Sequence, residues 1–538
     1  MLRPGIAPLV AVALTIGVGL VARTQDLDKP IWHDEVYTRV FATGHHSRDW
    51  IPALFTGRVT PRDEVLRFQR LDPDVGVGDT LAGLARDEPQ HPPLYYLLAR
   101  AWMGVFGDGL AALRVLSVLA SLAALWAAAW LAREAFPGPG PPVGPHVVML
   151  FAASPFMALY AQEAREYALW SVWILAASAA LLRALRLDAS EPSRARRAKA
   201  WALWAALCAL GLYTSLSHVS VILAQIAFVA WRERVRVRRA TISAALALTL
   251  AAALFLPWGL LVWQHREAFV ASMDWSRVIV VPTSEVVATL GVNLSRPLLD
   301  LWPTIEGPLA IAAVALAVGL ALAALVHLAR RGPPSTRALF VALVVVPVGL
   351  LVVPDLAFGG IRSFSTRYLM PALAATLVAI GFLLASLPRP ALRRAATTLV
   401  VGLALAGSLR TTADEVPWPR ALSAGLPAVA RAIDAAERPL VLGDRERHHP
   451  GNLHALATLV GPATDFLLLD FATRDALVER AAQGTWADTG LPDDRPIFVY
   501  APVPQLLAAL ERARGAPAIR VHEDAHVSCW RLDPPARP

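Results

Sequence analysis

The stretch GIAPLVAVALTIGVGLVA, residues 5–22, opens the chain with eighteen uncharged residues. A run of this length can cross the hydrocarbon core of a bilayer as one helix, and it is longer than the apolar part of a usual signal peptide, so we expect it to stay uncleaved. Ten further apolar runs lie at about 111–131, 146–161, 167–183, 201–215, 217–231, 240–262, 305–329, 338–355, 368–387 and 394–410. The sequence therefore predicts an α-helical polytopic membrane protein with about eleven transmembrane helices.

The overall composition supports this class. Of the 538 residues, 56% are hydrophobic and only 17% are charged, and the mean hydropathy is +0.48. Lys and Arg exceed Asp and Glu by eight, but the basic clusters lie between apolar runs, where they orient a membrane protein. We therefore expect no nucleic-acid partner. Cys208 and Cys529 offer neither a disulfide nor metal-ligand spacing.

The arginine clusters define a topology. Residues 183–199, 232–239, 330–337 and 389–394 should all be cytoplasmic by the positive-inside rule. With Met1 inside, the alternation fits only if residues 92–106 do not cross the membrane. We therefore predict an interfacial helix there on the outer face, where Tyr95, Tyr96 and Trp102 suit the headgroup level.

Two domains are predicted: a membrane domain at residues 1–410, whose outer loop spans 23–110, and a small extracytoplasmic α/β domain at residues 411–538. In the second, strand-like runs at 439–442, 466–469, 497–500 and 519–521 alternate with helix-like segments at 422–436, 473–483 and 503–514. The outer loop is expected to be helical near 34–43 and 79–86. The C-terminal domain shows no glycine-rich phosphate loop and no nucleophile elbow, so no chemistry is assigned to it.

The predicted topology places an acidic pair, Asp34 and Glu35, on the outer face with polar residues from several distant loops. A carboxylate at a membrane surface can act as general base on an acceptor hydroxyl, and arginines can hold a phosphate leaving group bidentately. Direct displacement with one base would invert the reacting carbon. Bland alternatives stay open: Glu163 and Arg165 could shield each other, and Arg362 and Arg367 could anchor helix ends at the headgroups.

A family resemblance rests on four motifs in a fixed order. They are Trp32-His33-Asp34-Glu35, His91-Pro92-Pro93-Leu94-Tyr95-Tyr96 followed by Leu113-Arg114, Gln162-Glu163-Ala164-Arg165-Glu166-Tyr167, and Arg367-Tyr368. Together they resemble the protein O-mannosyltransferase-like branch of the glycosyltransferase C superfamily, which includes bacterial relatives of the lipid A aminoarabinose transferase. The resemblance covers roughly residues 5–410.

The resemblance implies a polyprenyl-phosphate-sugar donor and chemistry on the outer face of the cytoplasmic (inner) membrane. It implies that Asp34 matches the catalytic aspartate of the family's first loop, with Glu35 beside it, and that Arg165 matches an arginine of a later outer loop. Metal use differs between branches, so the need for a divalent cation is left open. The chain lacks the long inserted domain of the mannosyltransferases proper, which puts a protein acceptor in doubt and leaves a lipid or a glycan beside it.

The resulting hypothesis is an inverting, multi-pass membrane glycosyltransferase with Asp34 and Glu35 as catalytic residues. The candidate substrate-binding residues are His91, Tyr95, Gln162, Glu163, Arg165, Tyr167, Arg362, Arg367 and Tyr368. The alternative is a transporter or flippase of a lipid-linked saccharide, which should carry ionisable residues in the middle of its spans. Those positions are almost free of charge here, which favours the enzyme.

Overall fold

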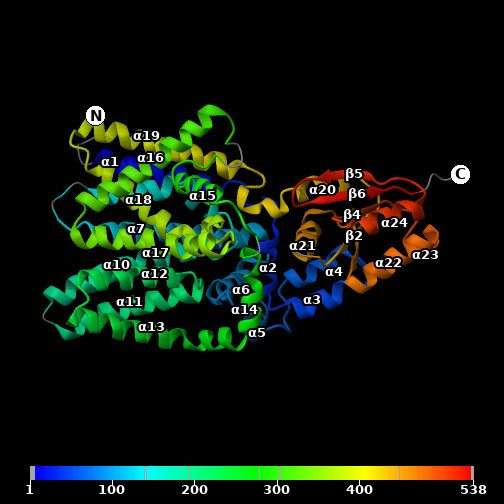
Figure 1. The fold of residues 1–538 in the computed structure, drawn as a ribbon, viewed down its shortest axis with the longest axis horizontal. Helices are drawn as coiled ribbons and strands as arrows, with labels where there is room; N and C mark the ends of the chain where they lie inside the picture. The colour runs from blue at the N-terminus through cyan, green and yellow to red at the C-terminus, as the bar shows by residue number, and fades with distance from the viewer. Residues whose placement is uncertain are drawn as a thin grey trace. The chain divides into compact units, whose positions relative to one another are not determined.

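The computed structural model describes residues 6–138, 140, 142–191, 193–277, 279–301, 305–446 and 449–534 (Figure 1). Met1, predicted to be cytoplasmic, and the first residue of the first predicted span lie outside these ranges. The chain divides into two compact units. Unit 1 comprises Met1–Leu27, Leu84–Tyr95 and Leu113–Asp414, and unit 2 comprises Asp28–Gly83, Tyr96–Ala112 and Glu415–Pro538.

Unit 1 is built from helices. They are α1 (Ile6–Thr24), α7 (Leu110–Ala135), α8 (Val143–Ala153), α9 (Pro155–Ala161), α10 (Tyr167–Ser190), α11 (Arg194–Thr214), α12 (His218–Arg232), α13 (Arg239–Gln264), α14 (Arg266–Ser272), α15 (Thr283–Ser295), α16 (Gly307–Arg331), α17 (Pro334–Phe358), α18 (Met370–Ala385) and α19 (Pro390–Ala413). Short 3-10 turns η2 (Asp274–Ser276), η3 (Arg362–Phe364) and η4 (Thr366–Leu369) join some of them.

Each of the eleven predicted spans coincides with helix in the structure. Among the described residues, seven helices are long and apolar enough to cross a membrane, or eight if the bent pair α8 and α9 is one span, and α1 and α12 contain shorter apolar helices. The run 146–161 was predicted as one span, but it is bent by 56° between α8 and α9. Pro155 explains the break, because it has no N–H to continue the helix. The helix α6 (Leu94–Phe106), predicted to be interfacial, has only 13 residues.

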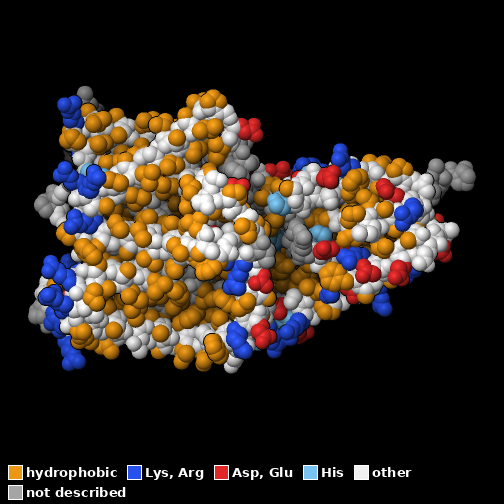
Figure 2. All heavy atoms as spheres, in the orientation of Figure 1, with side chains coloured by type: hydrophobic (Ala, Val, Ile, Leu, Met, Phe, Trp, Pro, Cys, Tyr) orange, Lys and Arg blue, Asp and Glu red, His pale blue; other side chains and the backbone are white. Residues whose placement is uncertain are grey.

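The outer surface of unit 1 suits lipid. Leu246, Trp263 and Leu316 are each two-thirds or more exposed. A water-soluble fold seldom exposes large apolar side chains in contiguous patches, so this surface is better suited to lipid than to water. Figure 2 shows apolar side chains along the helices on this face, with many Lys and Arg side chains gathered at one end of them. The interior spans α10 and α18 are largely buried instead. This distribution agrees with basic loops on one side of a bilayer.

Unit 2 is an α/β unit. Its N-terminal elements are α2 (His33–Ala42), α3 (Ser47–Leu54), β1 (Val59–Pro61), α4 (Arg62–Leu66), η1 (Arg67–Gln69), and most of α5 (Val77–Asp87) and α6. Its C-terminal elements are η5 (Trp418–Ser423), α20 (Leu426–Asp434), β2 (Leu440–Asp444), α21 (His449–Leu459), β3 (Asp465–Leu469), α22 (Phe471–Gln483), α23 (Trp486–Thr489), β4 (Ile497–Tyr500), α24 (Pro504–Arg514), β5 (Ile519–Glu523) and β6 (Ser528–Leu532).

The six strands form one sheet in the order β1-β3-β2-β4-β6-β5. Strand β2 pairs in parallel with β3 and β4, while β1 and the β6-β5 hairpin complete the sheet with antiparallel pairing. The four predicted strands are all present, whereas β1, β6 and helix α21 were not predicted.

The structure groups the chain differently from the predicted division at residue 410, since residues 28–83 and 96–112 fold with the C-terminal segment. Strand β1 pairs with β3, with Val59 opposite Leu467. The buried side chains of Val36 and Trp50 belong to the same core cluster as Phe466. The predicted outer loop therefore supplies part of the core of the α/β unit.

Candidate functional site

The acidic pair lies in unit 2, in the first turn of α2. A helix N-terminus stabilises negative charge, which suits two consecutive carboxylates there. The Asp34 side chain is 16% exposed, and its Oδ1 lies 3.0 Å from Nε2 of His33, whereas Glu35 is fully buried. The backbone N–H of His33 donates to Oγ of Ser423 at 3.3 Å and ties the start of α2 to η5. Asp34 is thus the member of the pair that solvent or a substrate can reach.

The other nine candidate residues lie in unit 1, and three of them belong to the loop between α9 and α10. We call this loop together with Tyr167, the first residue of α10, the arginine loop (residues 162–167). Glu163, Arg165 and Glu166 are each at most 3% exposed, so their charges must be compensated inside the protein. Nε of Arg165 lies 3.4 Å from Oε2 of Glu166, and Oε1 of Glu166 lies 3.2 Å from Nδ1 of His91.

The electrostatics of the loop fix the charge of Glu166. Burial alone would raise the pKa of this carboxyl group, but the Arg165 guanidinium and the hydrogen bond to His91 outweigh burial and lower the pKa to about 2. Glu166 is therefore ionised at neutral pH. Through Glu166, these contacts join His91, from the predicted outer loop, to Arg165.

The ring of Tyr167 brings two arginines together, and we call Arg165, Tyr167 and Arg367 the Tyr167 cluster. The Cζ atoms of Arg165 and Arg367 lie 5.8 Å and 5.7 Å from its centroid, and Arg367 also lies 5.5 Å from the ring of Tyr368. Tyr167 is 1% exposed, and its hydroxyl makes no hydrogen bond within the described part of the chain. Two guanidinium groups therefore lie near one ring, and the planar fork of a guanidinium group matches the oxygens of a phosphate. The arrangement can therefore bind a phosphate.

Gln162 and Tyr95 link the arginine loop to the protein around it. Nε2 of Gln162 donates to the carbonyl oxygens of Ala22 and Gln25, at 3.0 and 2.6 Å. The hydroxyl of Tyr95 lies 2.8 Å from Oγ of Ser117, which in turn donates to the Arg165 carbonyl at 3.4 Å.

Arg362 has a different environment. Its guanidinium donates to Oδ1 of Asp355 and to the Gly359 carbonyl, both at 2.8 Å. Ser363 also donates to Asp355, through its backbone N–H and its hydroxyl. These contacts close the C-terminal end of α17, so the described partners of Arg362 are not those of the Tyr167 cluster.

Sequence reasoning missed several residues beside the cluster. Glu166 stood inside the quoted motif but was not chosen. Oδ1 of Asn293 accepts hydrogen bonds from Oγ1 of Thr366 at 2.6 Å and Nε of Arg296 at 3.1 Å, and Arg296 pairs with Asp300 at 2.9 Å. The i, i+4 spacing of Arg296 and Asp300 was the available signal. This network holds η4, which carries Arg367.

No metal centre is evident in the described ranges, where no group of three or more His, Cys, Asp and Glu side chains could hold an ion.

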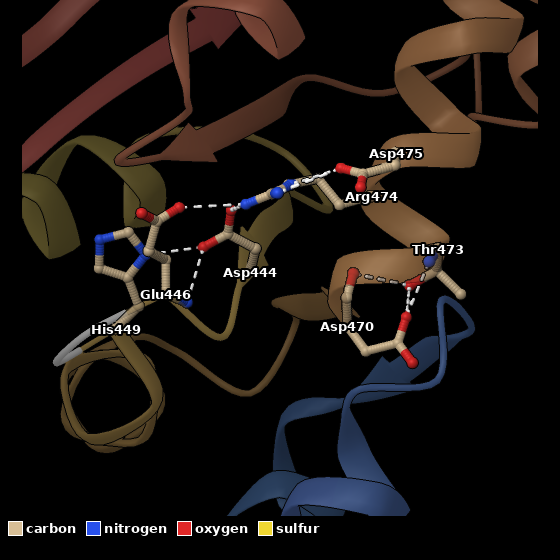
Figure 3. A network of polar contacts seen from close by, with 7 residues as sticks. All are labelled: Asp444, Glu446, His449, Asp470, Thr473, Arg474 and Asp475. Carbon is tan, nitrogen blue, oxygen red and sulfur yellow. Dashed lines mark hydrogen bonds and ion pairs between the residues drawn. The ribbon is translucent and has the colours of Figure 1, made fainter.

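A second polar network lies in unit 2 at the carboxyl end of β2 (Figure 3). Oδ1 of Asp444 lies 2.8 Å from Nδ1 of His449, and its Oδ2 accepts from Arg474 at 3.3 Å. Burial would raise the pKa of Asp444, but these contacts lower it below its ordinary value. Arg474 also pairs with Glu446 and Asp475, both at 3.1 Å. The network joins β2 to α21 and α22.

Comparison with known proteins gives the family context. Residues 90–263 match the family model described as dolichyl-phosphate-mannose-protein mannosyltransferase. The match includes His91 and the arginine loop, while Asp34 and Arg367 lie outside it. No curated protein sequence matches the chain.

The fold is similar to that of ArnT from Cupriavidus metallidurans. The crystal structure of ArnT bound to undecaprenyl phosphate has 12% sequence identity and a TM-score of 0.56, over 98% of each chain. The apo structure has 13% identity and a TM-score of 0.55, over 97% of each chain. At this low sequence identity, the structural similarity establishes a shared fold and nothing finer. With the family match, it confirms the resemblance to the glycosyltransferase C superfamily that the motifs predicted.

Proposed function

We propose that the chain is an integral membrane glycosyltransferase that moves a sugar from a polyprenyl-phosphate donor to an acceptor on the outer face of the cytoplasmic membrane. The proposal rests mainly on one observation: the guanidinium groups of Arg165 and Arg367 both lie near the ring of Tyr167. The fold shared with ArnT, which has been crystallised with undecaprenyl phosphate, and the mannosyltransferase family match support this donor class.

Donor recognition falls to the Tyr167 cluster. Arginine offers a planar fork that binds two phosphate oxygens at once, which a point charge cannot do. The unpartnered hydroxyl of Tyr167 can donate a further hydrogen bond to the same group. Glu166 keeps Arg165 in place from the protein side, since both are almost fully buried. These groups would stabilise the negative charge that develops on the phosphate as the sugar leaves.

Asp34 would serve as general base. Its carboxylate takes the proton of the acceptor hydroxyl while the acceptor oxygen attacks the anomeric carbon. The bond from that carbon to the phosphate oxygen breaks, and polyprenyl phosphate leaves with the electron pair. One displacement inverts the anomeric centre. Glu35, fully buried beside Asp34, would orient α2 and not touch the acceptor. The basic loops would face the cytoplasm, and unit 2 would lie outside it.

The decisive experiment measures donor turnover. Purified protein in lipid nanodiscs is incubated with a panel of polyprenyl-phosphate sugars and candidate lipid, glycan and protein acceptors, and released polyprenyl phosphate is quantified. We expect release with at least one donor and inverted configuration in the product. Movement of a labelled lipid-linked saccharide across proteoliposomes without any release of polyprenyl phosphate would instead establish the transporter and refute the enzyme.

A further inference from the structure

The break between α8 and α9 creates a problem inside the membrane domain. A helix interrupted within a bilayer leaves backbone carbonyl groups without partners, and these must be satisfied by protein groups. Pro155 has no N–H, so the carbonyl of Phe151 loses its i+4 partner. The carbonyls of Ala152 and Ala153 lie at the same break. Oγ of Ser408 donates to the Ala153 carbonyl at 2.6 Å, which satisfies one of the three.

Arg23 satisfies the other two. It lies near the end of α1, is 1% exposed, and donates to the carbonyls of Phe151 and Ala152 at 2.8 and 2.6 Å. Its Nε donates to Oγ of Ser121 in α7 at 3.0 Å, and it also caps the Gly19 carbonyl at 2.9 Å. One guanidinium group thus joins α1, α7 and the end of α8. A buried cation bound to four neutral oxygens is costly, so its presence at this position indicates a specific task.

The same segment of α1 also holds the far end of α9. Gln162, which follows α9, donates to the carbonyls of Ala22 and Gln25 on either side of Arg23. The approach of α1 to α8 needs Gly19, because a Cβ there would lie only 2.4 Å from the Ala152 carbonyl oxygen. The end of α1 therefore holds the chain just before α9 through Arg23 and just after α9 through Gln162.

We infer that Arg23 is a positioning residue that clamps α9 and thereby sets the place of the arginine loop. It acts through the last carbonyl groups of α8, which directly precede α9, and its donors are directed to protein oxygens, so it does not bind the donor phosphate itself. The consequence for activity rests on the function proposed above, whereas the clamp is a property of the fold. Lysine cannot replace it, since one ammonium cannot reach four oxygens spread over three helices.

A labelling experiment tests the clamp directly. Ala164→Cys places a thiol at a fully buried position of the arginine loop, and Ala176→Cys places one at a buried position within α10. The native Cys208 and Cys529 are both buried and give a low background. We expect Arg23→Met to raise the labelling rate at position 164 at least tenfold and to leave position 176 unchanged.

Matched variants sharpen the test. Arg239→Met removes an arginine that is 59% exposed and should alter labelling at neither position. Arg23→Lys should resemble Arg23→Met. If Arg23→Met does not fold, Gly19→Ala disturbs the same contact by placing a Cβ against the Ala152 carbonyl oxygen, and it should expose position 164 by itself. Unchanged labelling at 164, or equal increases at 164 and 176, overturns the positioning role.

Donor turnover is measured on the same samples. A raised donor KM in Arg23→Met, together with exposure of position 164, supports both the clamp and the proposed donor site. Exposure of position 164 in a protein whose wild type turns over no polyprenyl-phosphate sugar leaves the clamp standing and removes the proposed function. Wild-type KM and kcat with an exposed loop would show that the arginine loop does not bind the donor, and would overturn the link between clamp and activity.

Discussion

Replacement of Arg165 by lysine tests the phosphate-binding role of the Tyr167 cluster most directly. The ammonium keeps the charge but loses one arm of the fork, and one charge-assisted hydrogen bond contributes about 1.5–3 kcal/mol. The contact with the Tyr167 ring, now 5.8 Å from Cζ, would weaken by a further ~0.5–1 kcal/mol. A loss of about 2–4 kcal/mol corresponds to roughly a 30- to 1,000-fold fall in kcat/KM. We expect the same range for Arg367→Lys, because Arg367 lies at nearly the same distance from the ring.

The assay is release of polyprenyl phosphate from the donor, normalised to folded protein by size-exclusion chromatography and thermal unfolding. Arg239→Lys is the matched control, since this exposed arginine pairs with Asp188 and has no contact with the arginine loop. Arg362→Lys adds a comparison, because the described contacts of Arg362 are with Asp355 and Gly359. Activity near wild type in both Arg165→Lys and Arg367→Lys would refute the reasoning and leave the two arginines as helix anchors.

Four further outcomes are expected. Asp34→Asn keeps the shape but cannot accept a proton, so transfer should fall about 100- to 10,000-fold with unchanged membrane insertion; wild-type turnover would remove Asp34 as base. Tyr167→Phe should raise the donor KM without lowering the melting temperature, because the lost hydroxyl has no hydrogen bond in the described structure; an unchanged KM would contradict its contact with phosphate. Glu166→Gln should lower the free energy of unfolding at pH 7 by on the order of 3 kcal/mol, since it leaves buried Arg165 poorly compensated. Because the fold lowers the pKa of Glu166 from 4.5 to about 2, this difference in stability from wild type should persist above pH 4.5 and shrink only as the pH falls toward 2. A cysteine replacing Gly107 should react with an impermeant thiol reagent in intact cells while one replacing Ser190 should not, and the reverse pattern would overturn the predicted topology.

Apolar run length placed helix at each predicted span of unit 1, because lipid demands long uncharged segments whatever their neighbours, but it did not predict α14 and α15. The same reasoning could not predict the break at Ser154, since Pro155 within a membrane helix is often tolerated without one. It also missed β1, whose three residues Val59 to Pro61 carry too little pattern to indicate a strand. That strand exists because β3 offers an open edge for it.

The candidate site was predictable in its chemistry more than in its contacts. The motif from Gln162 to Tyr167 indicated a polar loop, but nothing in it showed that Gln162 faces α1 while Tyr167 faces Arg367. Such directions depend on helix rotation and on partners far away in the chain. The ion pair of Arg362 with Asp355 was equally hidden, since Asp355 ends an apolar span and was not considered.

The pairing of β1 with β3 has a consequence for biosynthesis. About 400 residues separate Val59 from Leu467, its partner in the sheet. At about 5–20 residues per second, a ribosome needs roughly 20–80 s to add them. During that interval the segment with Asp34 has been translated but lacks the buried surface of α21 and β3 against which its core side chains pack. The helices of unit 1 can insert as they emerge, whereas α2 must wait for the last quarter of the chain. The proposed catalytic aspartate would therefore acquire its final setting only at the end of synthesis, so that an incomplete chain stays inert in the membrane.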